Sequence, residues 1–118
     1  MRIFDVDQAT PADVRDHSET LLAGEEVHAA FTSQAGAILF TDRRIVLVTR
    51  ENLLEERVET SSYPYREVRR FALQESAGGD GFRQLRVWLG NEEHPLQLRA
   101  RTGADLHALQ RLLAEKLV

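Results

Sequence analysis

Four histidines are the side chains of this 118-residue chain that could most readily hold a metal ion or move a proton near neutral pH. They are His17, His28, His94 and His107. They fall on separate predicted elements, and no two have the i, i+4 spacing that places a pair of histidines on one face of a helix. The chain has no cysteine, which excludes disulfides, zinc–thiolate sites and thiol nucleophiles. We therefore predict no metal site and no cofactor.

The hydroxyl groups and a glycine-rich segment give no catalytic pattern either. The serines lack the sequence context of a nucleophile elbow, and no histidine–acid pair is placed beside them. Residues 78–81 (Gly-Gly-Asp-Gly) lack the Lys-Ser/Thr of a phosphate-binding loop and precede a predicted strand rather than a helix. That segment is typical of a hairpin loop. We predict that the chain is not an enzyme.

Bulk properties limit the remaining classes of function. A chain of 13.4 kDa with 42% hydrophobic and 29% charged residues fits one ordinary folded domain, residues 1–118. The net charge of -4, with both signs interspersed, would repel phosphates unless the basic residues gathered on one face, so we expect no nucleic-acid partner. No apolar run approaches the roughly 20 residues of a membrane-spanning helix, and the first residues lack the apolar stretch of a signal peptide. We expect a cytoplasmic protein.

The clearest structural signal is a β-hairpin. Two dense apolar runs, residues 37–41 and 44–50, flank Asp42-Arg43, a pair suited to a tight turn. The second run contains Ile45-Val46-Leu47-Val48 and is apolar on both faces of the expected strand. We expect its second face to be covered by a helix, another sheet or a neighbouring subunit.

Helix-capping residues and the spacing of apolar residues predict the other elements. A helix over 11–23 begins after the N-cap residue Thr10. A strand over 25–32 follows, from which Phe31 faces the core. Val68 and Phe71 are three residues apart, which indicates a bulge near Arg69-Arg70. The other predicted elements are a turn at 33–36, an edge strand at 53–60, a strand at 67–74, a loop at 77–81, strands at 84–89 and 96–101, and a helix capped by Thr102 with a Leu106, Leu109, Leu113 and Leu117 stripe.

Three segments in this order resemble the bacterial pleckstrin-homology (PH) family. They are Gly24-Glu25, the Phe-Thr-x-x-Arg pattern at 40–44 and Pro64-Tyr65-Arg66-Glu67-Val68, and the similarity continues through Trp88 to the final helix, over about residues 20–118. The resemblance implies a strongly bent antiparallel barrel of seven strands closed by a C-terminal helix. It also implies cyclic homo-oligomers of unassigned biochemical role, and it does not imply an enzyme.

The predicted fold class is therefore mainly β (α+β), a PH-like, strongly bent seven-stranded antiparallel barrel capped by a C-terminal helix, with a short N-terminal helix. In the single domain 1–118, residues 1–23 form an N-terminal helical segment, 24–101 the barrel strands and 102–118 the capping helix. Eukaryotic relatives of this fold bind phosphoinositides through cations in the loop joining the first two strands. Here that loop, residues 33–36, has no basic residue, so we expect no specific phosphoinositide binding.

A candidate interface follows from Trp88, which points away from the leucines of its strand and shares its outward face with Arg86. Tryptophan and arginine are enriched in binding hot spots, although a tryptophan lying across a neighbouring strand or under the N-terminal helix would explain the same pattern. Tyr65, Val46 and Val48 are the other residues of this predicted interface, since the double-faced strand also needs a cover. The remaining arginines are expected to be solvated or paired with glutamates across strands.

The leading functional hypothesis is a non-enzymatic scaffold or protein-interaction module that self-associates into a cyclic homo-oligomer. Two alternatives stay open. One is a small-molecule or lipid-binding barrel, which requires an internal cavity with converging polar groups. The other is capture of a protein or peptide by strand addition at a sheet edge.

Overall fold

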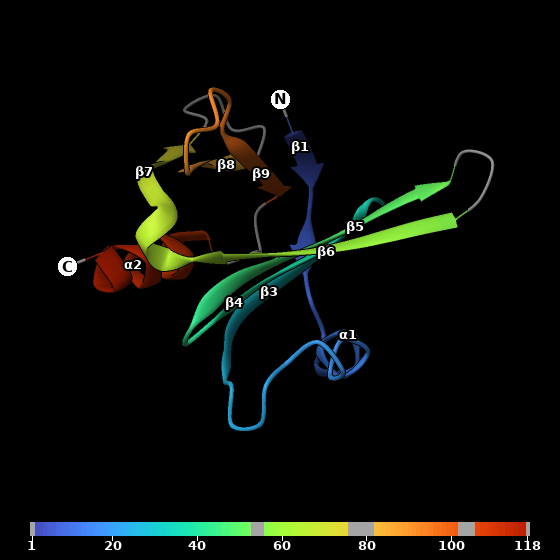
Figure 1. Ribbon diagram of the computed structural model, residues 1–118. Helices are drawn as coiled ribbons and strands as arrows, with labels where there is room; N and C mark the ends of the chain where they lie inside the picture. Colours follow the sequence, from blue (N-terminus) through green and yellow to red (C-terminus); the bar gives the residue numbers. More distant parts are fainter. Residues whose placement is uncertain (1, 53–55, 76–81, 102–105, 118) are drawn as a thin grey trace. The chain divides into compact units, whose positions relative to one another are not determined.

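The computed structural model describes residues 2–52, 56–75, 82–101 and 106–117 (Figure 1). These residues form nine β-strands, two α-helices and one short 3₁₀ helix. They divide into two compact units, one made of residues 8–64 and the other of residues 1–7 and 65–118. In the part of the chain that is described, no helix has the length and apolar character needed to span a membrane.

The unit of residues 8–64 contains the predicted hairpin within a five-stranded sheet of order β2-β3-β4-β5-β6. Phe40 pairs with Ile45 at its closed end, which confirms the turn at Asp42-Arg43. Phe31 is buried as predicted and meets the Phe40 ring edge to face at 6.4 Å. The strands are β2 (Asp7–Gln8), β3 (Val27–Ser33), β4 (Gly36–Thr41), β5 (Arg44–Asn52) and β6 (Glu56–Pro64).

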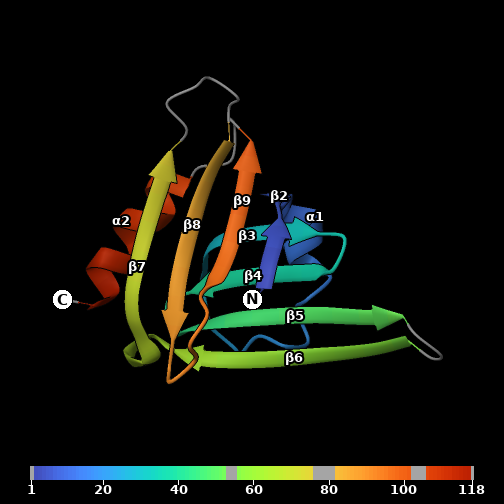
Figure 2. The same cartoon turned by 90° about the horizontal axis from the view of Figure 1, so that it is seen from above.

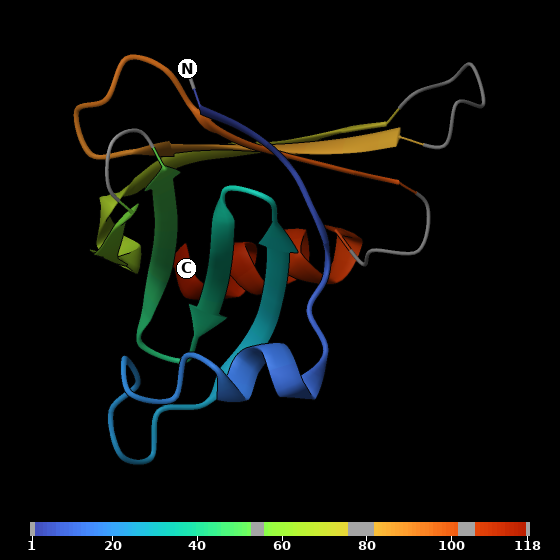
Figure 3. The same ribbon diagram turned by 90° about the vertical axis from the view of Figure 1, so that its right-hand side faces the viewer.

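Strand β5 is buried on both faces, and one of those faces is covered by the N-terminal segment of the same chain. Val46 and Val48 form an apolar cluster with Ala30, Ala37 and Leu39, and Ala9, Val14 and Val27 pack against it. Figure 3 shows α1 (Pro11–Arg15) lying beside β3 and β4. The cover expected from the sequence is therefore supplied by residues 9–14.

Helix α1 is shorter than predicted, because it ends at Arg15 instead of residue 23. Its start is as expected. Thr10 accepts a hydrogen bond from the Asp13 backbone, the Asp13 carboxylate accepts one from the Thr10 backbone, and this last bond holds the pKa of Asp13 below its usual range. After Arg15 the run Asp-His-Ser-Glu-Thr has weak helix propensity and no apolar period, so the chain continues in i→i+3 turns such as Ser18 N–H to the Arg15 carbonyl.

An ion pair inside this unit joins the segment before β3 to the hairpin. The Arg44 guanidinium donates from Nε and Nη2 to the two Glu25 carboxylate oxygens, both at 2.9 Å. It also donates to the Thr20 carbonyl and the Ser62 hydroxyl, each at 2.8 Å. The Thr41 hydroxyl donates to Glu25 Oε2 at 2.6 Å and accepts from the Arg44 backbone at 3.0 Å. The segment before β3, the hairpin and β6 are thereby joined through one guanidinium.

The carboxylate of this pair is buried while Arg44 is partly exposed, and the contact shifts the titration of both groups. The Glu25 side chain has no exposed area. Hydrogen bonding from Arg44 is the main cause that lowers the pKa of Glu25 to about 2, and the same bond raises the pKa of Arg44. A buried charge that lost its partner would be strongly destabilising.

The unit of residues 1–7 and 65–118 contains a four-stranded sheet of order β1-β9-β8-β7, seen side by side in Figure 2. Strand β1 pairs parallel to β9, with Phe4 opposite Leu98. The sequence analysis predicted no strand there, because four residues carry too little pattern. The elements are β1 (Arg2–Asp5), the 3₁₀ helix η1 (Tyr65–Glu67), β7 (Val68–Glu75), β8 (Phe82–Leu89), β9 (Leu96–Arg101) and α2 (Leu106–Leu117).

Strand β8 alternates as predicted. Leu85, Val87 and Leu89 are buried, whereas the residues between them are partly exposed. Helix α2 contacts β7 and β8 and lies along one face of this sheet (Figure 3), and its Leu106, Leu109 and Leu113 are fully buried. The predicted cap at Thr102 and the loop at 77–81 fall outside the described residues.

The mainly β fold with a C-terminal helix is confirmed, with two differences in detail. The described strands form two separate sheets and no hydrogen-bonded ladder closes them into a barrel, and two short N-terminal strands add to the seven predicted. Strand β6 continues to Pro64 instead of ending at residue 60, because its polar end, Thr60 to Tyr63, pairs residue by residue with β5, and the predicted start at 53–55 falls outside the described residues. Hydrogen bonding to β5 here outweighs the weak intrinsic strand preference of these polar residues.

Gly36 is predicted to be indispensable to the hairpin. Its φ is +144°, and a Cβ there would lie 1.8 Å from the Val48 carbonyl oxygen. Gly36→Ala should lower the free energy of unfolding by at least about 2 kcal/mol, measured by urea denaturation. Gly24→Ala is the matched control, because Gly24 has φ +79° but open space around it, so only about 1 kcal/mol should be lost. Equal losses would contradict the steric account.

Acid should remove the contribution of the Glu25–Arg44 pair. The folded-state pKa of Glu25, about 2, lies below its ordinary value of 4.5, so the stabilisation is complete above about pH 4.5 and lost as the pH falls toward 2. At about 1.4 kcal/mol per pKa unit this amounts to at most roughly 3 kcal/mol, less the screening that water at the partly exposed Arg44 provides. Glu25→Gln should lower stability at pH 7 and flatten this acid dependence in urea melts, whereas Glu26→Gln at an exposed neighbour should do neither. An unchanged acid profile in Glu25→Gln would contradict the assignment.

Candidate interaction surface

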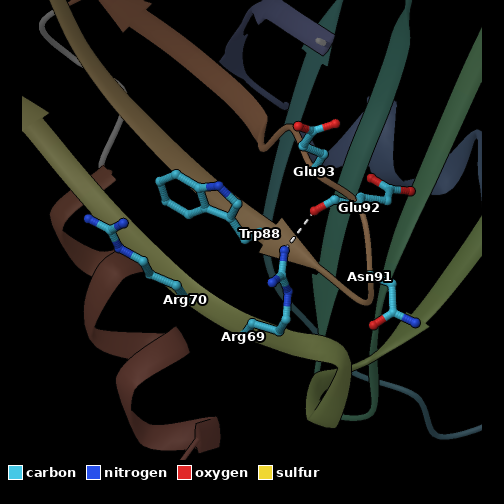
Figure 4. A pocket seen from close by; sticks show the side chains of 6 residues that line it. All are labelled: Arg69, Arg70, Trp88, Asn91, Glu92 and Glu93. Carbon is cyan, nitrogen blue, oxygen red and sulfur yellow. Dashed lines mark hydrogen bonds between the residues drawn. The ribbon is translucent and has the colours of Figure 1, made fainter.

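Trp88 lies between two arginine side chains on the face of the four-stranded sheet opposite the buried leucines. The guanidinium carbon of Arg70 is 4.6 Å from the centroid of the indole ring, and that of Arg86 is 5.5 Å from it. Arg70 comes from β7 and Arg86 from β8, two residues before Trp88. Figure 4 shows Trp88 and Arg70 side by side on the two strands. Such contacts are attractive because the ring face carries negative charge density.

A β-bulge places Arg70 beside Trp88. Val68 pairs with Leu89, but the register shifts by one residue so that Arg70 pairs with Trp88 and Phe71 with Val87. Val68 and Phe71 thus share the buried side, as their spacing predicted. Arg69 is the extra residue, and its Nη2 donates to the Glu92 carbonyl at 2.6 Å (Figure 4).

The loop between β8 and β9 completes a shallow pocket of about 450 Å³ beside the indole. Its lining residues carry both signs of charge and are exposed except for Trp88. They are Arg69, Arg70, Trp88, Asn91, Glu92 and Glu93. We call these residues, together with Arg86, the Trp88 surface.

The two cations that flank the indole have no carboxylate partner among the described residues. Arg86 Nε is buried, and no described group accepts a hydrogen bond from it. A buried donor without an acceptor costs roughly 1–3 kcal/mol. A partner cannot reach the buried Nε of Arg86, so the exposed guanidinium of Arg70 is the cation beside Trp88 that is open to an acceptor such as a carboxylate.

The same face of the sheet continues toward β1. Arg99 lies over the Phe82 ring at 5.2 Å and donates to the Asp5 carboxylate at 2.7 Å, and this bond raises the pKa of Arg99. Arg99 is therefore already paired with a carboxylate of the same chain. Arg70 and Arg86 differ from Arg99 in having no carboxylate partner among the described residues.

The predicted interface residues separate into two groups. Trp88 and Arg86 come together as expected. Tyr65 is 7% exposed, and the Lys116 ammonium lies 5.6 Å from its ring centroid. Val46 and Val48 are 0% and 3% exposed beneath residues 9–14. These three residues have almost no area left for a partner. Sequence reasoning missed Arg70 as a neighbour of Trp88, because the spacing of Val68 and Phe71 indicates a bulge in β7 and does not say which residue of β8 lies opposite it.

The other residues considered for chemistry do not converge. No group of three or more histidine or acidic residues that could hold a metal occurs in the part of the chain described. His107 pairs with Glu75, and His28 and His94 are exposed on other elements.

The two sheets, the C-terminal helix and the Arg44–Glu25 motif define a β protein of the PH type. The model of the bacterial PH domain family matches residues 2–117, and the chain belongs to this family. The uncharacterized protein YjqA of Bacillus subtilis (strain 168) is 29% identical over 107 residues, covering 90% of this chain and 86% of that protein.

Solved structures of bacterial PH proteins share the fold. A DUF1696 family protein with a pleckstrin-homology domain from Shewanella loihica PV-4 superposes with a TM-score of 0.80 at 17% identity, covering 98% of this chain and 99% of that one. A pleckstrin homology domain from Shewanella amazonensis SB2B gives a TM-score of 0.70 at 21% identity, over 92% and 97% of the two chains. These likenesses establish the architecture and leave the biochemical role open.

Proposed function

We propose that this bacterial PH domain is a non-enzymatic scaffold that self-associates through the Trp88 surface into a cyclic homo-oligomer. The observation that carries the proposal is a partly exposed tryptophan in contact with two arginines that have no carboxylate partner among the described residues. Binding hot spots are enriched in these two residue types.

Rigidity of the supporting strand favours binding here. The opposite side of β8 is fully packed, with Leu85 and Val87 at 0% exposure. Contacts with Arg70 and Arg86 restrict the indole before any partner arrives. Ordering side chains on association costs about 0.5–1.5 kcal/mol each, so a surface that is already ordered binds more tightly.

The charge of the surface favours a protein partner over a polyanion. Glu92 and Glu93 lie beside Arg69 and Arg70 in the same pocket, and they would repel a phosphate backbone. Mixed charges around an aromatic centre instead fix the orientation of a protein partner. Closed cyclic symmetry is the usual outcome when one chain carries its own binding surface.

The alternatives gain less support. Small-molecule pockets are mostly apolar, whereas the pocket at Trp88 and a second one at Asp5, Asp7, Phe82 and Arg99 are lined mainly by charged groups. The turn between β3 and β4, which includes Gln34 and Ala35, has no cation for a phosphoinositide headgroup. We therefore keep the absence of specific phosphoinositide binding as part of the proposal.

Truncating the indole should dissociate the assembly. In light scattering behind size exclusion, the unmodified chain should give a defined multiple of 13.4 kDa. Trp88→Ala should weaken self-association by at least about 30-fold, since hot-spot truncation costs about 2 kcal/mol or more. Its mass should therefore fall toward one chain at micromolar concentration, with an unchanged circular dichroism spectrum.

Leu22→Ala serves as the control, because Leu22 is an exposed leucine (55%) on a different unit and should leave the mass unchanged. A folded Trp88→Ala variant that keeps the full mass, or an unmodified chain that is monomeric at every concentration, would overturn the proposal.

A further inference from the structure

Strands β5 and β6 extend beyond the rest of their sheet as a two-stranded ribbon (Figure 1). β4 pairs with β5 only as far as Thr49, opposite Gly36, whereas β6 pairs with β5 out to Asn52 opposite Glu56. The outer part of β6, Glu56 to Thr60, is exposed at every residue. This segment is a sheet edge that presents side chains on both faces to solvent.

One face of this ribbon pairs an apolar side chain with a carboxylate. Val58 is 56% exposed, one of three large apolar side chains that are exposed among the described residues. Glu56 lies two residues earlier and so projects to the same face. Glu59 is one residue from Val58 and three from Glu56, so it projects to the opposite face. This face therefore presents one apolar side chain and one carboxylate, Val58 and Glu56, to a partner.

The Trp88 surface has the matching spacing. Arg86 and Trp88 are also two residues apart on one face of a strand, so both pairs span about 7 Å. Val58 can pack on the indole while the Glu56 carboxylate meets the accessible part of the Arg86 side chain, which is partly exposed. Arg70, on the other strand, supplies a second cation to the same carboxylate. Guanidinium–carboxylate pairs are among the strongest hydrogen-bonded contacts in proteins.

We infer that the occupant of the Trp88 surface is the β5–β6 ribbon of a second copy of this chain, with Val58 on Trp88 and Glu56 on Arg86 and Arg70. This inference rests on the proposed self-association and names its contact. It joins two different surfaces, so each copy uses its Trp88 surface toward one neighbour and its ribbon toward the other. Such a head-to-tail contact closes into a ring when its rotation permits.

Charge reversal and its compensation test the pairing. Glu56→Arg and Arg86→Glu, as separate variants, should each weaken assembly by at least about tenfold in light scattering, because like charges would face each other. The double variant E56R/R86E should recover assembly, since the ion pair is restored with its signs exchanged. Mixing the two single variants should also restore contacts between unlike copies, because the two unmodified surfaces match each other and the two reversed surfaces are again opposite in charge.

Glu59→Arg is the matched control, with the same charge change on the opposite face of the same strand, and it should keep the full mass. If Glu56→Arg keeps the full mass while Trp88→Ala dissociates, the ribbon is not the occupant and the proposed function still stands. If both single reversals dissociate and neither the double variant nor the mixture recovers, the pairing is overturned. If Trp88→Ala also keeps the full mass, the proposed function itself fails.

Discussion

The ion pair between Arg44 and Glu25 is the interaction on which the five-stranded sheet depends. It joins the segment before β3, the hairpin turn and β6 through a single guanidinium with four hydrogen bonds to side chains and a carbonyl. The Gly24-Glu25 and Phe-Thr-x-x-Arg segments that resemble the bacterial PH family meet here. Their role is architectural, because the Glu25 side chain is wholly buried and all its acceptor capacity is used within the chain.

This closed network contrasts with the cations of the four-stranded sheet. Arg44 and Arg99 each have a carboxylate partner, whereas Arg70 and Arg86 have only the indole between them in the described structure. Burying the Glu25 carboxylate costs desolvation energy, which its hydrogen bonds to Arg44 and Thr41 offset. In the proposed assembly, Arg70 and Arg86 are the cations that contact a partner.

The sequence predicted the features that depend on local pattern. The alternation of apolar and polar residues predicted β8 and the outward position of Trp88. The spacing of Val68 and Phe71 predicted the bulge, and the N-cap residue Thr10 predicted the start of α1. Features that depend on distant partners were missed or misplaced. Strand β1 forms only because β9 offers it an edge, and β6 extends as far as β5 pairs with it. We predicted Val46 and Val48 as interface residues because the sequence alone does not show that residues 9–14 pack over them.

The most direct test of the central claim uses the single tryptophan of the chain as its own reporter. Acrylamide quenching of Trp88 fluorescence would be measured over a dilution series beside the mass from light scattering. If Trp88 lies between copies, its quenching constant should be low at concentrations where the chain is assembled and rise in step with dissociation. A quenching constant that stays the same while the mass falls to that of one chain would place Trp88 outside the contact and contradict the account.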